Sequence, residues 1–173
     1  MSLERLKSKV NQLITLCRTL NEARIITFEG NQTVKTVTLN CKNFTSLNNC
    51  FIRCYEIETI YLSNTQNVVN WNYTFQGTRK LIGIYGDIDF SSATSAANIF
   101  YVSPSLKDIS FVPETIRISI AIPSAVLSSE SIQSIIDGLA RVETAQTLTL
   151  DASIALTDEQ KTAISDKGWT LVQ

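Results

Sequence analysis

Four cysteines are the residues of this sequence best suited to chemistry, as nucleophiles, redox pairs or metal ligands. They stand at Cys17, Cys41, Cys50 and Cys54, so no two have the C-x-x-C spacing of a redox or zinc site. The chain contains no histidine and therefore lacks the commonest metal ligand and general base. Four cysteines could form two disulfide bridges, but we interpret these side chains as small apolar filler of a core.

Acidic residues in the segment GDIDF offer a second opportunity for chemistry. Asp87 and Asp89 lie on one side of a predicted strand, but calcium needs more oxygen ligands than two carboxylates supply. We therefore interpret this segment as a solvated turn. The sequence has no phosphate-binding glycine loop and, without histidine, no Ser-His-Asp set. We predict no catalytic residue, no metal and no cofactor, and expect a protein that is not an enzyme.

Length and composition indicate what kind of protein this is. A chain of 173 residues with 44% hydrophobic and 18% charged residues fits one globular domain with a sizeable core. The formal net charge is -1 and no block of like charge occurs, so we expect no nucleic-acid partner. No apolar run approaches the ~18–20 residues of a membrane span, so we expect no membrane insertion. The charged start MSLERLKSKVNQL does not resemble a signal peptide.

A short pattern of apolar residues repeats along the first two thirds of the chain. It occurs as Val34-x-x-Val37-x-Leu39, Ile57-x-x-Ile60-x-Leu62, Leu81-x-x-Ile84-x-Gly86 and Leu106-x-x-Ile109-x-Phe111. A second marker keeps step, because Phe51, Phe75 and Phe100 each precede the next unit by six residues. Three residues after each Phe comes a small residue, which is Cys54, Thr78 or Ser103.

The apolar pattern and the phenylalanine keep the same separation in successive units, which predicts a stacked repeat with one strand in each unit. Apolar positions two apart point into the core, and the residue between them points out. One unit cannot bury its own apolar face, so the units must stack, with the three Phe rings piled on the returning side. We expect strands near residues 34–39, 57–62, 81–86, 106–111, 115–122, 146–150 and 169–172.

The pattern F-x-x-[small]-x-x-[L/I]-x-x-I-x-[L/F] resembles the BspA-like leucine-rich repeats of bacterial surface and phage proteins. The resemblance covers roughly residues 33 to 122 and departs from the family at Gly86, where Leu is expected. It implies an α/β fold, namely a short leucine-rich-repeat solenoid with parallel strands on one face. It also implies adhesion and protein binding without a fixed active site.

The C-terminal part changes from strand to helix periodicity. Five apolar residues with helical spacing predict an amphipathic helix, and these are Ile132, Ile135, Ile136, Leu139 and Val142. Ser128 or Ser129 suits its N-cap. Thr157-x-x-Gln160 predicts a capping box that opens a second helix, and Gly168 predicts its end. We expect three parts: an N-terminal helix (1–24), the solenoid (25–127) and a helix-containing cap (128–173) that continues it.

The N-terminal segment carries a heptad stripe of apolar residues, namely Leu3, Leu6, Val10, Leu13, Cys17 and Leu20. Two interpretations stay open. The helix could lie on the first unit as a cap, which Ile14 and Leu16 favour because they widen the stripe. Alternatively, the stripe could be the seam of a short coiled-coil stem that joins copies of the chain into a homo-oligomer.

Outward residues of the predicted strands form two ladders across the sheet. The first ladder consists of Thr38, Tyr61, Tyr85 and Ser110, and the second of Thr36, Thr59, Gly83 and Asp108. Because adjacent strands lie ~4.8 Å apart, Tyr61 and Tyr85 should stand side by side. The pair is either a rigid aromatic platform for a protein or glycan partner or a cross-strand contact that only stabilises the sheet.

These features predict a non-enzymatic structural or binding module. Resemblance to surface and phage proteins, together with the unsecreted N-terminus, favours a virion component assembled in the host cytoplasm, associated with a tail or fibre, or an adhesin. The alternative is an adhesion protein of the bacterial cell surface whose leader was removed. A third hypothesis, a carboxylate-dependent glycan hydrolase, requires a cleft with two facing carboxylates ~5–10 Å apart.

Light scattering of the full chain and of a version without residues 1–22 separates the two interpretations of the heptad stripe. A cap predicts a monomer for both proteins. A stem predicts an oligomer that becomes monomeric on truncation.

Overall fold

The computed structural model describes residues 27–124 and 126–173 as a mixed α/β fold with parallel strands in two sheets. The first sheet contains β1 (Thr36–Asn40), β2 (Thr59–Ser63), β3 (Gly83–Ile88) and β4 (Asp108–Phe111), and the second contains β5 (Ile120–Ile122), β6 (Gln146–Leu150) and β7 (Trp169–Val172). The helices in the described ranges are η1 (Thr65–Asn67), α2 (Ser129–Gly138) and α3 (Asp158–Asp166). Within these ranges, no helix combines the length and apolar character that crossing a membrane requires.

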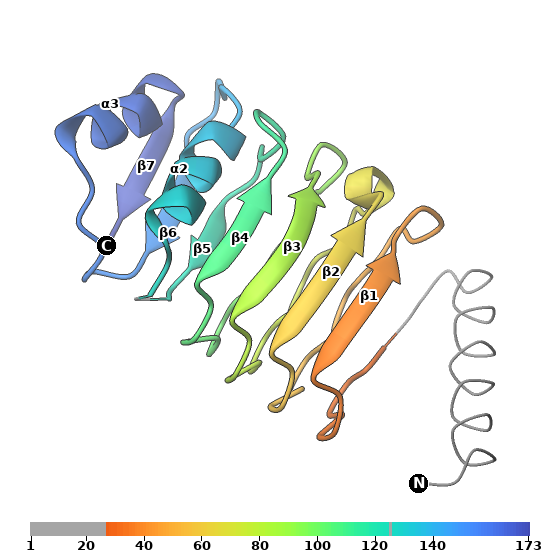
Figure 1. Cartoon of the computed structure of the whole chain (residues 1–173). Helices are drawn as coiled ribbons and strands as arrows, with labels where there is room; N and C mark the ends of the chain where they lie inside the picture. Colours follow the sequence, from red (N-terminus) through yellow and green to blue (C-terminus); the bar gives the residue numbers. More distant parts are fainter. Residues whose placement is uncertain (1–26, 125) are drawn as a thin grey trace, which may run out of the picture.

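The first sheet has its strands in chain order, and its register follows the sequence repeat (Figure 1). Val37 pairs with Ile60, Ile60 with Ile84 and Ile84 with Ile109. In β1 and β2 the apolar residues are buried and their neighbours are exposed or half-buried, as the alternation predicted. The predicted positions of β1 and β2 are confirmed, although each strand begins two residues later than expected.

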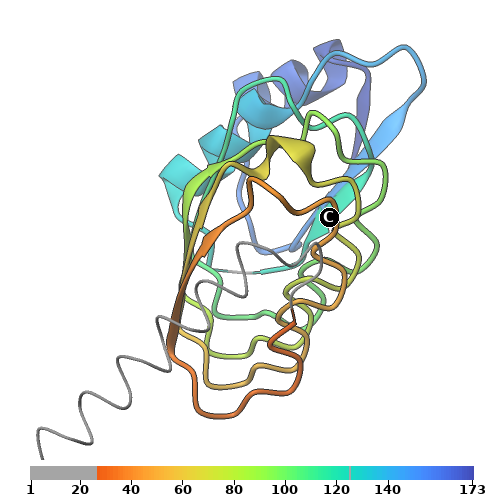
Figure 2. The ribbon, with the colours of Figure 1, turned by 90° about the vertical axis from the view of Figure 1, so that its right-hand side faces the viewer.

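The segments that return from one strand to the next also pair with one another. Phe51 N–H donates to the Thr74 carbonyl at 2.9 Å, and Phe75 N–H donates to the Ile99 carbonyl at 2.9 Å. The backbone of each return makes two tight turns, each with one residue of positive φ. The first turn has Asn49, Tyr73 or Asn98 at this position, and the second has Arg53, Gly77 or Val102. The returns therefore form a second hydrogen-bonded ladder, opposite the sheet, and the units overlie one another in Figure 2.

Four phenylalanine rings stack along this ladder. Ring centroids lie 5.3 Å apart for Phe28 and Phe51, 5.7 Å for Phe51 and Phe75, and 5.4 Å for Phe75 and Phe100. The rings are within 8° of parallel. The predicted stack of three is confirmed, and Phe28 extends it to the first described residues.

The small residues that follow these rings are buried and internally satisfied. The Thr78 and Ser103 hydroxyls lie 3.0 Å apart, and each donates to the Phe75 carbonyl at 2.7 Å. Cys54 is the equivalent residue one unit earlier, and its thiol donates to the Phe28 carbonyl at 3.0 Å. A side chain of this size fits between the stack and the next strand.

Gly86 does not occupy the Leu position of the third repeat, contrary to the sequence alignment. The register of β3 against β4 shifts between Ile84 and Ile88, and Ile88 pairs with Phe111. Two extra residues therefore bulge outward, and Ile88 supplies the buried side chain. Gly86 has φ of +96°, and a Cβ there would overlap the carbonyl oxygen of Leu62. Glycine is required because the bulge approaches the neighbouring strand too closely for a side chain.

The predicted strand 115–122 is wrong over most of its length. Ile116 makes a single bridge with Leu139, and regular pairing begins at Ile120. Ser119 N–H donates instead to the Gln146 side-chain oxygen at 2.8 Å. A side chain therefore takes the partner position that a strand residue would need, and β5 stays short.

After β4, helices replace strands on one side of the molecule, and strands replace the irregular return segments on the other side. Helices α2 and α3 continue the side of the molecule formed by the first sheet, whereas β5, β6 and β7 continue the side of the returns (Figures 1 and 2). One apolar core lies between the layers from Val37 to Trp169. The predicted β6 and β7 are confirmed residue for residue.

Helix α2 protects the open edge of the first sheet. Ser131 Oγ accepts a hydrogen bond from Ile109 N–H at 2.9 Å, and Ser134 Oγ accepts one from Phe111 N–H at 2.9 Å. These serines replace the carbonyls of a further strand and so block pairing with another chain at this edge. Ser128 is the N-cap and accepts from Ser131 N–H, which confirms one of the two predicted caps.

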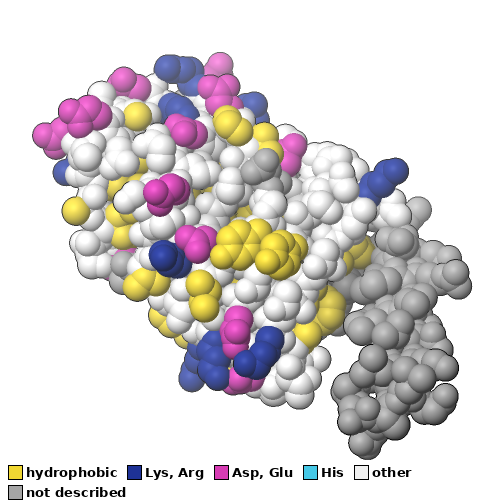
Figure 3. Space-filling view, viewed as in Figure 1, with side chains coloured by type: hydrophobic (Ala, Val, Ile, Leu, Met, Phe, Trp, Pro, Cys, Tyr) yellow, Lys and Arg dark blue, Asp and Glu magenta, His cyan; other side chains and the backbone are white. Residues whose placement is uncertain are grey.

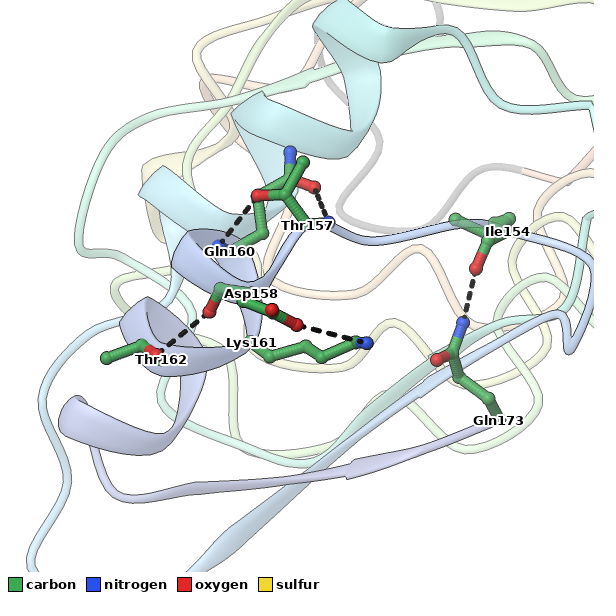
Figure 4. Close-up of polar contacts among 7 residues, drawn as sticks. All are labelled: Ile154, Thr157, Asp158, Gln160, Lys161, Thr162 and Gln173. Carbon is green, nitrogen blue, oxygen red and sulfur yellow. Dashed lines mark hydrogen bonds and ion pairs between the residues drawn. The ribbon is translucent and has the colours of Figure 1, made fainter.

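Helix α3 begins at the predicted capping box (Figure 4). Thr157 Oγ1 accepts from Gln160 N–H at 3.2 Å, and the Gln160 side chain accepts from Thr157 N–H at 3.0 Å. Gly168 follows the helix with φ of +85°, as the predicted stop requires. The Gln173 side chain donates to the Ile154 carbonyl at 2.7 Å and fixes the segment after β7.

Truncation of the phenylalanine stack should cost most at its centre. Phe75→Ala removes a ring that is fully buried and stacked on both faces, so it should lower the free energy of unfolding by about 3–5 kcal/mol. Urea denaturation measures this change. Tyr101→Ala is the control, because that side chain is 55% exposed and should cost less than about 0.5 kcal/mol. Equal effects of the two variants would contradict the stack.

Replacing glycine by alanine should destabilise the protein to different degrees at Gly30 and at Gly86, both of which have positive φ. Gly30→Ala at φ +68° meets no atom within 4 Å, so it should cost about 1 kcal/mol from backbone strain alone. Gly86→Ala adds the overlap with Leu62 and should destabilise clearly more. Thermal unfolding of both variants tests this order, and an equal loss would show that the bulge can relax.

Candidate functional site

The exposed face of the β1–β4 sheet, called the front face below, carries the two ladders predicted from the sequence. Thr38, Tyr61 and Tyr85 are neighbours in register, and so are Thr36, Thr59, Gly83 and Asp108. Ser110 follows Ile109 on β4 and is half-buried. Figure 3 shows a hydrophobic patch in the middle of this face, flanked by acidic and basic side chains.

Tyr61 and Tyr85 form the centre of the front face. Their ring centroids lie 5.4 Å apart with a 30° tilt, and the side chains are 45% and 39% exposed. The Tyr85 ring lies over Gly83, where a Cβ would fall 2.6 Å from the ring carbon that bears the hydroxyl. Gly83 therefore makes room for the ring, which keeps a fixed position on the sheet.

Asp108 holds the outer end of Tyr85. The Tyr85 hydroxyl donates to Asp108 Oδ2 at 3.4 Å. Partial burial, the negative charge of Asp108 and this hydrogen bond all raise the pKa of Tyr85 above its usual value. The phenol therefore stays protonated near neutral pH and presents a neutral ring.

A depression of about 440 Å³ lies beside this ring, where α2 rises next to β4. Its sheet side includes Tyr85, Asp108 and Ser110, and its helix side includes Ser128, Glu130, Ser131 and Ser134. Ile84 and Ile109 lie at its floor, with their side chains buried in the core. The sequence predicted Tyr85, Asp108 and Ser110 as part of an exposed face but missed the helix side, because the cap of α2 indicated where the helix begins and not what it faces.

Charged pairs border the front face at the start of the strands. Lys35 binds Glu58 at 2.8 Å, and Lys80 binds Glu56 at 2.8 Å. The hydrogen bond with Glu58 is the largest cause of the raised pKa of Lys35, and the bond with Lys35 is the largest cause of the lowered pKa of Glu58. These side chains are substantially exposed, so solvent screens both pairs and they add little stability.

The cysteines of the described ranges are buried and free of disulfides. Burial raises the pKa of Cys41 to about 12 and also raises the pKa of Cys50 and of Cys54. A buried protonated thiol is a poor nucleophile, which agrees with their interpretation as core filler. Cys17 and the rest of the predicted seam, Leu3, Leu6, Val10, Leu13 and Leu20, lie outside the described residues.

The predicted turn over GDIDF is only partly correct, because Gly86, Asp87 and Ile88 belong to β3 and the chain leaves the strand at Asp89. Asp89 Oδ1 accepts from Ser91 N–H at 2.8 Å, a local bond typical of turns. In residues 27–124 and 126–173, no group of three or more Cys, Asp or Glu side chains could hold a metal ion.

Comparisons with protein-family models, with curated proteins and with solved structures found no match to this chain.

Buried thiols predict that stability falls at alkaline pH. An unfolded thiol has a pKa of about 8.5, whereas the three buried thiols titrate higher. Their contribution to the free energy of unfolding is complete below about pH 8.5. It is lost as the pH rises through the pKa values of the folded protein, because the unfolded chain then binds fewer protons than the folded one. Urea denaturation at pH 7 and pH 10 should show this loss, and Cys41→Ala should reduce it.

Thiol labelling provides an independent check. In a Cys17→Ser variant, an aromatic disulfide reagent at pH 8 should label no thiol of the native protein and three thiols after denaturation. Fast labelling of the native protein would contradict the burial.

Proposed function

We propose that this chain is a non-enzymatic binding module built as a short leucine-rich-repeat solenoid of the BspA-like type. The proposal is supported by units of 23 to 25 residues in the sequence and by the in-register pairing of β1 to β4. The ladder of return segments adds to this support. In such an architecture each unit presents one strand on a common face, which is the usual binding surface of repeat proteins.

The observation that carries the proposal is the exposed aromatic pair Tyr61 and Tyr85. Large aromatic side chains on a rigid surface provide contact area at little entropic cost, and tyrosine is enriched among residues that dominate binding energy. Both rings are fixed before a partner arrives, since each lies against the other and Tyr85 also rests on Gly83. The proposed partner is a protein or glycan surface that covers this pair.

A binding role fits the two carboxylates that line the depression, Asp108 and Glu130, better than hydrolysis does. A glycan hydrolase needs one carboxyl that stays protonated, which requires shielding from water. Asp108 is half-buried and Glu130 is exposed, so neither has that environment. The same two groups can serve as hydrogen-bond acceptors for a ligand without such shielding.

The biological setting that we propose is a phage virion, with the chain as a tail-associated or fibre-associated component or an adhesin. A bacterial cell-surface adhesin is the alternative. Both settings rest on the resemblance of the repeat to BspA-like proteins, and both place the front face against a bacterial or host surface.

Binding of fluorescently labelled protein to a panel of bacterial cells tests the front face. Tyr61→Ala and Tyr85→Ala should each reduce binding by about tenfold or more, as expected for residues that dominate an interface. Tyr101→Ala is the matched control, because Tyr101 is exposed outside the strands and should not affect binding. Protease or periodate treatment of the cells separates a protein partner from a glycan partner.

Two results would contradict the proposal. One is a wild-type protein that binds no cell of the panel. The other is binding that both tyrosine variants retain while circular dichroism shows that they are folded.

A further inference from the structure

We propose that the depression between β3, β4 and the first turn of α2 binds a neutral sugar residue, stacked against Tyr85 and hydrogen-bonded to Asp108. This inference rests on the proposed function and specifies the partner of the front face. It names a chemical class, a polyhydroxylated ring without net charge, and one place where that ring lies.

The size and surface of the depression suit a ligand of this class. Its volume of about 440 Å³ is within the ~300–1,000 Å³ of typical small-ligand sites. Tyr85 is 39% exposed and supplies the accessible aromatic surface, since Ile84 and Ile109 are buried in the core. A pyranose ring has an apolar face of C–H groups, which can pack against an aromatic ring.

Hydrogen-bond donors and acceptors meet at this depression. Asp108 offers carboxylate oxygens, one of which receives only the long 3.4 Å bond from Tyr85. Ser131 and Ser134 use their oxygens to accept from β4, and among the described contacts neither hydroxyl donates. Ser131 is only 3% exposed and its hydroxyl is already bonded to the Ser128 hydroxyl at 2.9 Å, so the half-buried Ser134 is the more accessible donor of the two. Sugar hydroxyls both donate and accept, and can use both kinds of group.

The electrostatics disfavour an anionic ligand. An anion would face Asp108 and Glu130, the two carboxylates that line the depression. The N-terminal end of α2 is equivalent to roughly half a positive charge, which offsets the attraction of these carboxylates for a cation only in part. A neutral sugar avoids the repulsion and donates charge-assisted hydrogen bonds from its hydroxyls to the carboxylates, and a cationic ligand is the competing outcome of the test.

Saturation-transfer difference NMR and titration of the full chain test this inference. The neutral probes are glucose, galactose, mannose and N-acetylglucosamine. Sialic acid is the anionic probe and glucosamine the cationic one. A hexa-arginine peptide represents a basic segment of a protein partner. At least one neutral sugar should bind, with the strongest transfer to its ring C–H protons. Asp108→Asn should weaken that binding about tenfold, and Glu130→Gln should weaken it less.

Glu143→Gln is the matched control, because Glu143 is exposed and does not line the depression. It should bind the sugar as the wild type does. Circular dichroism of each variant separates loss of binding from loss of fold.

Three results would overturn the inference. In the first, no neutral sugar binds. In the second, Asp108→Asn and Glu130→Gln leave sugar binding unchanged. In the third, sialic acid, glucosamine or hexa-arginine binds in a manner that depends on Asp108 and neutral sugars do not. If cell binding still depends on Tyr61 in these cases, the proposed function stands and only the sugar site fails. If cell binding also fails, both proposals fall together.

Discussion

In the part of the chain that forms the first sheet, each repeat unit must place its buried side chains directly against the equivalent side chains of the unit before it. The constraint comes from two ladders, because β1 to β4 pair in succession and the return segments pair with one another as well. A residue that is buried in one unit therefore lies directly against its equivalent in the next. The phenylalanine rings show this most clearly, with centroid spacings of 5.3 to 5.7 Å along four units.

The same constraint gives the front face its rigidity and its limits. Side chains on the face can change identity from unit to unit because they do not pack inward, and Thr38, Tyr61 and Tyr85 accordingly share one row. The sheet ends where α2 replaces a fifth strand and its serines satisfy the edge of β4. The depression lies where α2 follows β4, because the helix projects further from the front face than the strand beside it.

The sequence predicted those parts of the fold in which local pattern and long-range pairing agree. The apolar repeat located β1 and β2, and its phenylalanine marker identified the stack. The capping box and Gly168 located α3, whose start and end depend on neighbouring residues alone. The outward position of Tyr61 and Tyr85 followed from alternation along a strand.

The remaining features depend on contacts that no local pattern contains. Gly86 interrupts the repeat in the sequence, whereas in the structure a bulge lets Ile88 supply the missing buried side chain. Ile116 and Ile118 alternate like strand residues, but Gln146 occupies the partner position next to Ser119. Glu130 and Ser134 reach the depression only because α2 packs beside β4. The phenylalanines mark where the returns lie, but the return ladder itself is made by main-chain groups, which no residue type reports.

Native-state hydrogen exchange of the return segments tests the central claim most directly. The account predicts that the amides of Phe51, Arg53, Phe75 and Gly77, which donate to the next unit, exchange as slowly as the paired amides of β2 and β3. Slow exchange in the strands combined with fast exchange at these four amides would contradict it, because the returns would then be ordinary loops and the stacked units would be joined by the sheet alone.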